Sequence, residues 1–288
     1  MTENKNEKHQ NEKTPSTTGH SWDGISEYNI PAPRWWLIVW MVCIIWSVIY
    51  WFFYPAWPIF GGNSKGSLNW SQQSQLEESQ GEIDSLRADY LEKIRKSSFS
   101  DIQKDKNLME FALNGGRSAF RENCAACHGT GAAGYKGFPN LNDDDWLWGG
   151  KIEDIYYTLN YGIRSGHDQA RANQMPAFGA TKVLTKQQVK DVAQYVMSLS
   201  DKASANQEGE AIFKGNCVAC HGAAGKGNRE LGAPNLTDKI WLYGGEKEDI
   251  IFTITYSRNG VMPYWKGRLD DAVIKQLSLY VHSLGGGE

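Results

Sequence analysis

The sequence predicts an all-α protein in which one N-terminal membrane helix precedes two copies of a small helical domain. Residues 35–54 contain no charged side chain, no glycine and no proline. As a helix, about twenty residues span roughly 30 Å, which matches the hydrocarbon core of a bilayer. From about residue 108 to the end, blocks of sequence return in the same order. Such self-similarity indicates a duplicated domain.

Composition excludes several classes of protein. The 288 residues carry a formal net charge of −3, with acidic and basic side chains mixed along the chain. Nothing therefore suggests a nucleic-acid surface, and no nucleic-acid partner is expected. Four of the five cysteines belong to two short motifs, which leaves only Cys43, within the apolar stretch. A disulfide framework is thus not expected.

The first third of the chain divides into three segments. Residues 1–33 form a cytoplasmic N-terminal tail, of which residues 1–21 are polar enough to be disordered. Residues 34–56 form the transmembrane helix, with aromatic residues at both ends as interfacial belts have. No small-residue cleavage site follows it, so we interpret it as an uncleaved anchor. Residues 57–107 form a connector that contains one amphipathic helix.

The repeated part divides into a first domain at 108–201 and a second at 202–288. Phe120, Asn123 and Cys124 return as Phe213, Asn216 and Cys217, and a Pro-Asn-Leu block follows in both copies. Each copy is small for a stable core, but a bound haem would supply a large apolar body at its centre.

Each copy contains the attachment signature of a c-type haem, which is Cys-x-x-Cys-His. The motifs are Cys124, Cys127 and His128 in the first copy, and Cys217, Cys220 and His221 in the second. The two thiols of a motif bond covalently to the haem vinyl groups, and the histidine is the fifth ligand of the iron. The chain is therefore predicted to hold two covalently bound haem c groups. A zinc site built from the cysteine pairs is the weaker alternative.

A methionine at the same point of each copy is the expected sixth ligand. Met175 and Met262 both stand before a proline in a loop ahead of the last helix of their copy. Thioether ligation raises the reduction potential and is typical of electron transfer. The metal ligands predicted are thus His128, Met175, His221 and Met262, and no catalytic residue is expected.

Two questions about these ligands stay open in the sequence. Spacing favours ligation within each copy only by default, because two facing domains can exchange their methionine loops. His167 lies in an insertion of the first copy and is a possible rival of Met175.

The two domains resemble class I cytochromes c through Cys-x-x-Cys-His, Pro-Asn-Leu and Met-Pro. The segment HSWDGISEYNIPAPRWW, residues 20–36, is similar to the segment that heads the membrane-anchored dihaem subunit of cbb3-type cytochrome c oxidases. This subunit, subunit III or P, also has a connector resembling residues 68–71 (LNWS). The resemblance covers roughly residues 20 to 286.

The resemblance implies a role and a set of partners. The subunit would accept electrons from a donor cytochrome c and pass them, through the monohaem subunit, to the catalytic haem–copper subunit of a proton-pumping complex. Attachment of c-type haem outside the bacterial cytoplasmic membrane implies a single-pass inner-membrane protein with periplasmic cytochrome domains, in contact with lipid. The slight basic excess before the helix agrees with a cytoplasmic N-terminus.

Two other functions remain to be weighed. A membrane-tethered dihaem cytochrome could serve a periplasmic dehydrogenase, although such a tether has no need of the segment at 20–36. A dihaem peroxidase needs an open or displaceable ligand at one iron, which two methionine ligands do not provide.

Overall fold

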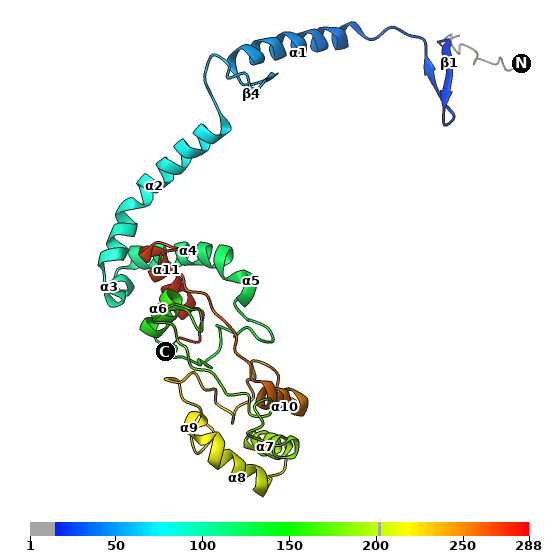
Figure 1. Cartoon of the computed structure of the whole chain (residues 1–288). Coiled ribbons are helices and arrows are strands. Elements are labelled where there is room, and N and C mark those ends of the chain that lie inside the picture. The colour runs from blue at the N-terminus through cyan, green and yellow to red at the C-terminus, as the bar shows by residue number, and fades with distance from the viewer. Residues whose placement is uncertain (1–14, 201–202, 288) are drawn as a thin grey trace, which may run out of the picture. The chain divides into compact units, whose positions relative to one another are not determined.

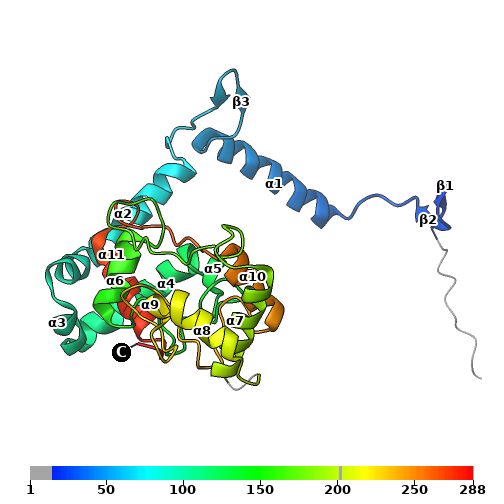
Figure 2. The same cartoon turned by 60° about the horizontal axis from the view of Figure 1, so that its bottom comes forward.

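The computed structural model describes residues 15–200 and 203–287 and consists of two units, residues 1–84 and 85–288. Figures 1 and 2 show the chain from two directions. Each unit is described by itself below. The described part of the chain is mostly helical, as predicted, with two short β-hairpins in the first unit.

The first hairpin corrects part of the sequence prediction. Strands β1 (Thr17–Trp22) and β2 (Ile25–Tyr28) pair antiparallel, whereas residues 1–21 were expected to be disordered; residues 1–14 lie outside the described residues. The reason is the two-residue turn of Asp23 and Gly24, whose φ angles of 50° and 84° suit the tight hairpin turn that Asp-Gly favours. Local turn chemistry therefore decides the structure of an otherwise polar segment.

Helix α1 (Arg34–Phe53) is the predicted membrane helix. It is twenty residues long, is apolar enough to span a bilayer, and has no buried residue. An apolar surface on all sides is what a helix surrounded by lipid requires. The helix ends three residues before the predicted boundary, because Tyr54 is extended before Pro55. Strands β3 (Pro58–Ile59) and β4 (Gly62–Asn63) follow as a short hairpin.

The predicted connector helix is α2 (Gln72–Lys96), whose last residues belong to the second unit. Helix α3 (Phe99–Lys104) follows, with the Ser98 hydroxyl accepting a hydrogen bond from its first turn. The Lys275 ammonium group donates to the backbone carbonyls of Ile94, Arg95 and Ser97. These carbonyls would otherwise lack partners, so Lys275 fastens the end of α2 to the last helix of the chain.

The rest of the second unit consists of eight helices with the following bounds: α4 (Lys106–Asn123), α5 (Ala125–His128), α6 (Ile152–Tyr161), α7 (Lys186–Leu199), α8 (Gln207–Asn216), α9 (Val218–His221), α10 (Lys247–Tyr256) and α11 (Asp271–His282). Helix α11 packs on α4 and α6, and α7 packs on α8 and α10. The same arrangement is visible in Figure 1, where α11 lies against α4 and α7 lies beside α8 and α10.

The C-terminal helices of the two repeats have therefore exchanged places. Helix α7 belongs to the first repeat by sequence, but it closes the core around Phe213, Ile250 and Ile254 of the second. Helix α11 in turn closes the core around Phe120 and Leu159 of the first. The two packing units are consequently not the two contiguous segments 108–201 and 202–288.

A glycine permits close crossing of helices in each half. A Cβ atom on Gly116 of α4 would lie 2.3 Å from the carbonyl oxygen of Gln276 in α11, and one on Gly209 of α8 would lie 2.1 Å from that of Asp191 in α7. Neither distance is compatible with a real side chain. Both glycines therefore set how closely the exchanged helices approach.

Alanine at Gly116 or at Gly209 is expected to lower the Tm of the detergent-solubilised protein by several degrees. Overpacking costs about 1–3 kcal/mol, and each kcal/mol shifts Tm by roughly 2–4 °C in a unit of this size. Gly215→Ala is the matched control, since a Cβ there meets nothing within 4 Å. Thermal unfolding followed by circular dichroism measures the difference. Equal Tm values for all three variants would contradict the close-crossing role.

Candidate haem sites

The two Cys-x-x-Cys-His motifs have the same local structure. In the first, α4 ends at Asn123, Cys124 follows as its cap, and the single turn α5 carries the chain to His128. Gly129 ends this turn with a φ of 78°. In the second, Cys217 caps α8 and the single turn α9 ends at His221. All four cysteines are free thiols, as covalent attachment of a haem requires.

A backbone carbonyl orients each histidine ring. The Nδ1 atom of His128 lies 3.1 Å from the carbonyl oxygen of Pro139, and Nδ1 of His221 lies 3.1 Å from that of Pro234. Because a carbonyl oxygen only accepts, Nδ1 carries the proton and Nε2 keeps its lone pair for a metal. Burial lowers the pKa of both histidines. Both rings are thus held in the neutral form that ligates iron.

Burial also acts on the first thiol of each motif. It raises the pKa of Cys124 to about 11 and that of Cys217 to about 11, and the neighbouring thiols Cys127 and Cys220 add to the effect. These thiols are therefore protonated in the absence of a metal or haem. Among the described residues, no three His, Cys, Asp or Glu side chains gather closely enough to hold a metal ion between them. The zinc alternative thus has no geometric support.

Each methionine packs against the core that adjoins the haem motif of the other repeat. Met262 packs against the core that contains Phe120, Cys124 and Leu159. Met175 packs against the core that contains Phe213, as Cys217 also does. The exchange of C-terminal helices brings the methionine loops with it, because each loop directly precedes the exchanged helix of its repeat.

Hydrogen bonds fix the two methionine loops where they cross. Met262 and Ile163 exchange both backbone hydrogen bonds, N–H of each to the carbonyl of the other, at 3.0 Å. The Ser257 hydroxyl donates to the carbonyl of Met175 at 2.6 Å. Each methionine is thus held by the segment that follows α6 or α10 of the opposite repeat.

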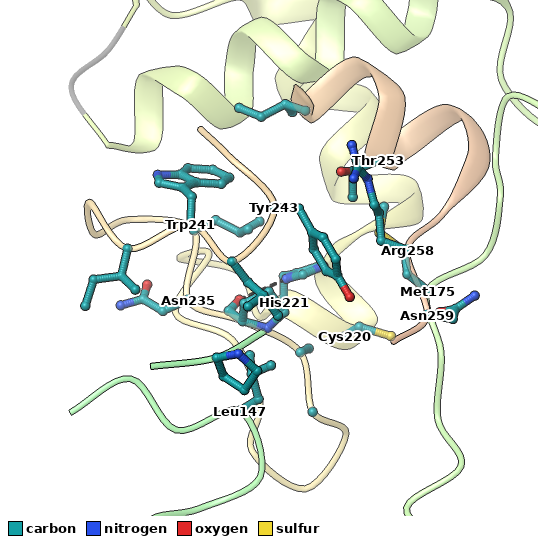
Figure 3. A pocket seen from close by; sticks show the side chains of 18 of the residues that line it. Leu147, Met175, Cys220, His221, Asn235, Trp241, Tyr243, Thr253, Arg258 and Asn259 are labelled. Carbon is teal, nitrogen blue, oxygen red and sulfur yellow. Dashed lines mark hydrogen bonds between the residues drawn. The ribbon is translucent and has the colours of Figure 1, made fainter. Parts of the chain in front are cut away.

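A cavity of about 530 Å³ adjoins the second motif, a size usual for a small-molecule site. Cys217, Cys220, His221 and Met175 all line it, and Figure 3 shows Cys220, His221 and Met175 around it, with Tyr243 and Arg258 nearby. Two thiols, an imidazole and a thioether in an otherwise largely apolar wall are the donor set of a covalently bound haem c. The residues present fit that group.

Residues of the first repeat complete the wall of this cavity. Tyr135, Phe138, Pro139, Asp145 and Trp148 line it together with the second motif. Pro139 is the residue whose carbonyl accepts from His128. The same loop therefore supports the proximal histidine of the first site and faces the second site.

Three functional candidates were not found by sequence reasoning. Arg164 and Arg258 line the cavity, and Arg258 has a buried Nε atom without a hydrogen-bond partner in the structure. Ser257 holds Met175. The sequence did contain a signal for the two arginines. Helix α6 ends at Tyr161 and Arg164 follows three residues later, while α10 ends at Tyr256 and Arg258 follows two residues later. This signal was overlooked.

His167 lies apart from Met175. Its ring contacts Tyr161 and Tyr264, with centroids 5.0 and 5.3 Å away, and its Nδ1 accepts from the backbone N–H of Gln169. His167 is absent from the wall of the cavity that Met175 lines. The geometry therefore gives no support to His167 as a rival of Met175.

An apolar helix able to span a bilayer, followed by two interlocked Cys-x-x-Cys-His sites, defines a membrane-anchored dihaem c-type cytochrome. Residues 14–61 match the family model for the N-terminal domain of cytochrome oxidase-cbb3, FixP. Residues 113–200 match cytochrome c, and residues 204–281 match cytochrome C oxidase, cbb3-type, subunit III. The chain belongs to the FixP/CcoP family of cbb3-type cytochrome c oxidase subunits.

Curated relatives agree with this assignment over nearly the whole chain. A cbb3-type cytochrome c oxidase subunit FixP of Bradyrhizobium sp. (strain ORS 278) is 51% identical over 277 residues, which is 95% of this chain and 96% of that protein. A subunit CcoP of Cereibacter sphaeroides is 46% identical over 278 residues, 95% of this chain and 96% of the relative. The predicted resemblance is confirmed, and the chain is a dihaem electron-transfer subunit of such an oxidase with two haem c groups.

The midpoint potential of the haem bound by Cys217 and Cys220 is expected to fall as pH rises through about 6. Burial raises the pKa of Asp145 to about 6, with Asp238 and Asp143 adding to the effect and Arg229 opposing it. Above that pH the ionised carboxylate, which lines the cavity, favours ferric iron. The midpoint potential is expected to shift by a few tens of mV. For a one-electron couple, about 59 mV corresponds to a tenfold change in the equilibrium constant.

Asp145→Asn is expected to abolish this step and to hold the potential at its low-pH value, as measured by spectroelectrochemical titration between pH 5 and 8. The exposed neighbour Asp144 supplies the control Asp144→Asn, which should leave the step in place. Persistence of the step in Asp145→Asn would assign it to another group.

Proposed function

We propose that the chain relays electrons from a donor cytochrome c through its two haems to a monohaem subunit of the oxidase, and from there to the haem–copper subunit that reduces oxygen. The observation that carries this proposal is that each motif histidine is held with Nε2 free for a metal, and that one methionine packs against the core beside each motif. When both axial positions are filled, a haem iron exchanges electrons without binding oxygen. Oxygen chemistry then belongs to another subunit.

We further propose that the methionine ligands are exchanged between the repeats. Met262 completes the coordination of the iron bound by His128, and Met175 completes that of the iron bound by His221. The packing of Met262 against the core that contains Cys124, and of Met175 against the core that Cys217 also contacts, supports this assignment. So do the cavity that Met175 and His221 both line and the backbone pairing of Met262 with Ile163. Ligation within each repeat would require each methionine to leave the core in which it packs.

Each residue near the irons has a defined task in this relay. The carbonyls of Pro139 and Pro234 accept from Nδ1 of the histidine rings, which leaves Nε2 of each ring free to hold the iron. The loop of Pro139 supports His128 and also lines the cavity of the second site, so it joins the two sites. A haem bound at each site would supply the one-electron exchange, while the protein holds and orients the ligands.

The proposed topology has residues 1–33 in the cytoplasm and both haem sites in the periplasm. The apolar helix and membership of an oxidase indicate the inner membrane. Lys5, Lys8, Lys13 and Arg34 precede α1, whereas Lys65 alone closely follows it, and the excess of basic residues usually stays inside. Attachment of c-type haem on the outer side of this membrane supports the same orientation.

The alternatives are less consistent with these features. A dihaem peroxidase needs one iron with an open position, and both sites here hold a candidate methionine ligand. A tether for a periplasmic dehydrogenase does not account for the match of residues 14–61 to the oxidase-specific N-terminal domain.

The exchanged ligation can be tested in a variant that keeps only the first haem, Cys217→Ala/Cys220→Ala. In that background Met262→Ala is expected to abolish the far-red band of a methionine–ferric iron bond, because the sulfur beside His128 is lost. Met175→Ala should leave the band unchanged, as measured by absorption of the oxidised protein. The reverse pattern would show ligation within each repeat.

The converse variant, Cys124→Ala/Cys127→Ala, provides an independent check on the second haem. There, Met175→Ala should remove the band and Met262→Ala should not.

Deletion of this chain from the oxidase is expected to abolish oxidation of a reduced donor cytochrome c, by at least about 100-fold, because the entry haems are removed. Oxygen consumption with a small artificial reductant should persist, since the haem–copper subunit is unaffected. An oxygen electrode measures both rates. If the tagged chain purified without a haem–copper subunit, the oxidase assignment would be wrong.

A further inference from the structure

The side chain of Arg164 connects the two methionine loops. Its Nε donates to the carbonyl of Gly260 at 2.8 Å, and its Nη1 donates to the carbonyl of Asn173 at 2.8 Å. Gly260 stands two residues before Met262, and Asn173 stands two residues before Met175. One guanidinium group is thus bonded to both loops close to their methionines.

The backbone on either side of Arg164 makes the same connection. Ile163 exchanges both hydrogen bonds with Met262, while the N–H of Arg164 donates to the carbonyl of Arg171 at 2.8 Å. The N–H of Arg171 in turn donates to the carbonyl of Gly162 at 3.1 Å, and the chain from Arg171 leads into the Met175 loop. Residues 162–164 therefore lie between the two loops, paired with both.

The chemistry of the guanidinium group suits this position. It is planar and presents its N–H donors in a rigid fork, so two carbonyls bonded to different edges are held at a fixed separation. A lysine ammonium is a point charge and does not fix two acceptors in this way. Hydrogen bonds from a charged donor are also stronger than neutral ones. Arg164 can accordingly define the distance between the loops as well as hold each one.

The charge of Arg164 is largely free of carboxylates. Its two side-chain partners are neutral carbonyls, and burial lowers its pKa, with nearby Tyr243 opposing that shift. The carboxylate of Asp249 is engaged by Lys136 at 2.6 Å and lies 3.9 Å from Arg258. Arg164 also lines the cavity of the second site. A partly desolvated cation there favours ferrous iron.

We propose that Arg164 is a positioning residue that holds both methionine loops at a fixed separation and thereby couples the axial ligation of the two haems. The inference rests on the proposed methionine ligation of both irons, but it does not depend on which methionine binds which iron. Release of either loop would loosen the other, because both are bonded to one rigid group.

Imidazole binding to the ferric full-length protein tests this coupling, since imidazole can bind a six-coordinate haem only after the methionine leaves. Two backgrounds, Met175→His and Met262→His, each leave one methionine-ligated iron. Arg164→Gln is expected to accelerate imidazole binding about tenfold in both backgrounds, because each loop loses a charge-assisted hydrogen bond. The control Arg117→Gln, at an exposed position of α4, should leave both rates unchanged.

Arg164→Lys separates the effect of the two hydrogen bonds to the loops from the effect of the positive charge, because lysine keeps the charge but not the rigid fork of donors. It is expected to restore the reduction potentials that Arg164→Gln lowers, because the charge is kept. Imidazole binding should stay fast, because one ammonium group does not span two carbonyls. Full restoration of slow binding by lysine would show that charge alone matters and would overturn the proposal.

The remaining outcomes are equally decisive. If Arg164→Gln accelerated imidazole binding in only one background, Arg164 would hold only one loop and the coupling would be refuted. If it accelerated binding in neither background, Arg164 would have no positioning role. The haem content of each variant is measured first. If Arg164→Gln does not retain both haems, the rate of imidazole binding is compared between Arg164→Lys and the unchanged Arg164 in the same two backgrounds. Absence of the methionine–iron band from the unmodified protein would refute the ligation itself, which is a different failure.

Discussion

The packing of each repeat's last helix on the other repeat is the interaction on which the rest of the haem-binding unit depends. Helix α11 lies on α4 and α6, and α7 lies on α8 and α10. Because a methionine loop directly precedes each of these helices, the exchange determines which methionine packs against which core. It also makes each core discontinuous in sequence, so neither repeat contains all the apolar residues that its own Cys-x-x-Cys-His motif needs.

The exchange makes the two haem sites parts of one structure. The loop of Pro139 supports the proximal histidine of the first site and forms part of the wall of the second. The N–H of Gly137 donates to the carbonyl of Leu242 at 2.7 Å, and Lys136 pairs with Asp249 beside it. These contacts join the two sites directly, so a change in the loop of one site is expected to affect the other.

Electrostatics around the second site combine opposing influences. Arg164 and Arg258 bring positive charge to the cavity wall, and Asp145 brings an acid whose pKa is raised to about 6. The cations favour ferrous iron, whereas ionised Asp145 favours ferric iron. Partly buried charges from both repeats therefore line this site in addition to the motif residues.

The sequence by itself determined the local features of this protein. An uncharged stretch of about twenty residues was sufficient for α1, and the spacing of Cys124, Cys127 and His128 was sufficient for a haem site, because these features involve residues close together in the chain. The turn at Asp23 and Gly24 was equally local, although the strands beside it were missed. Only the tertiary structure decided which core Met175 and Met262 each pack against. The repeats present nearly equivalent helix faces, with Gly116 and Tyr280 in one half and Gly209 and Tyr195 in the other, so α7 and α11 suit either core by sequence. The choice between cores arises from the connections and contacts of the whole unit, which a repeated sequence pattern does not specify.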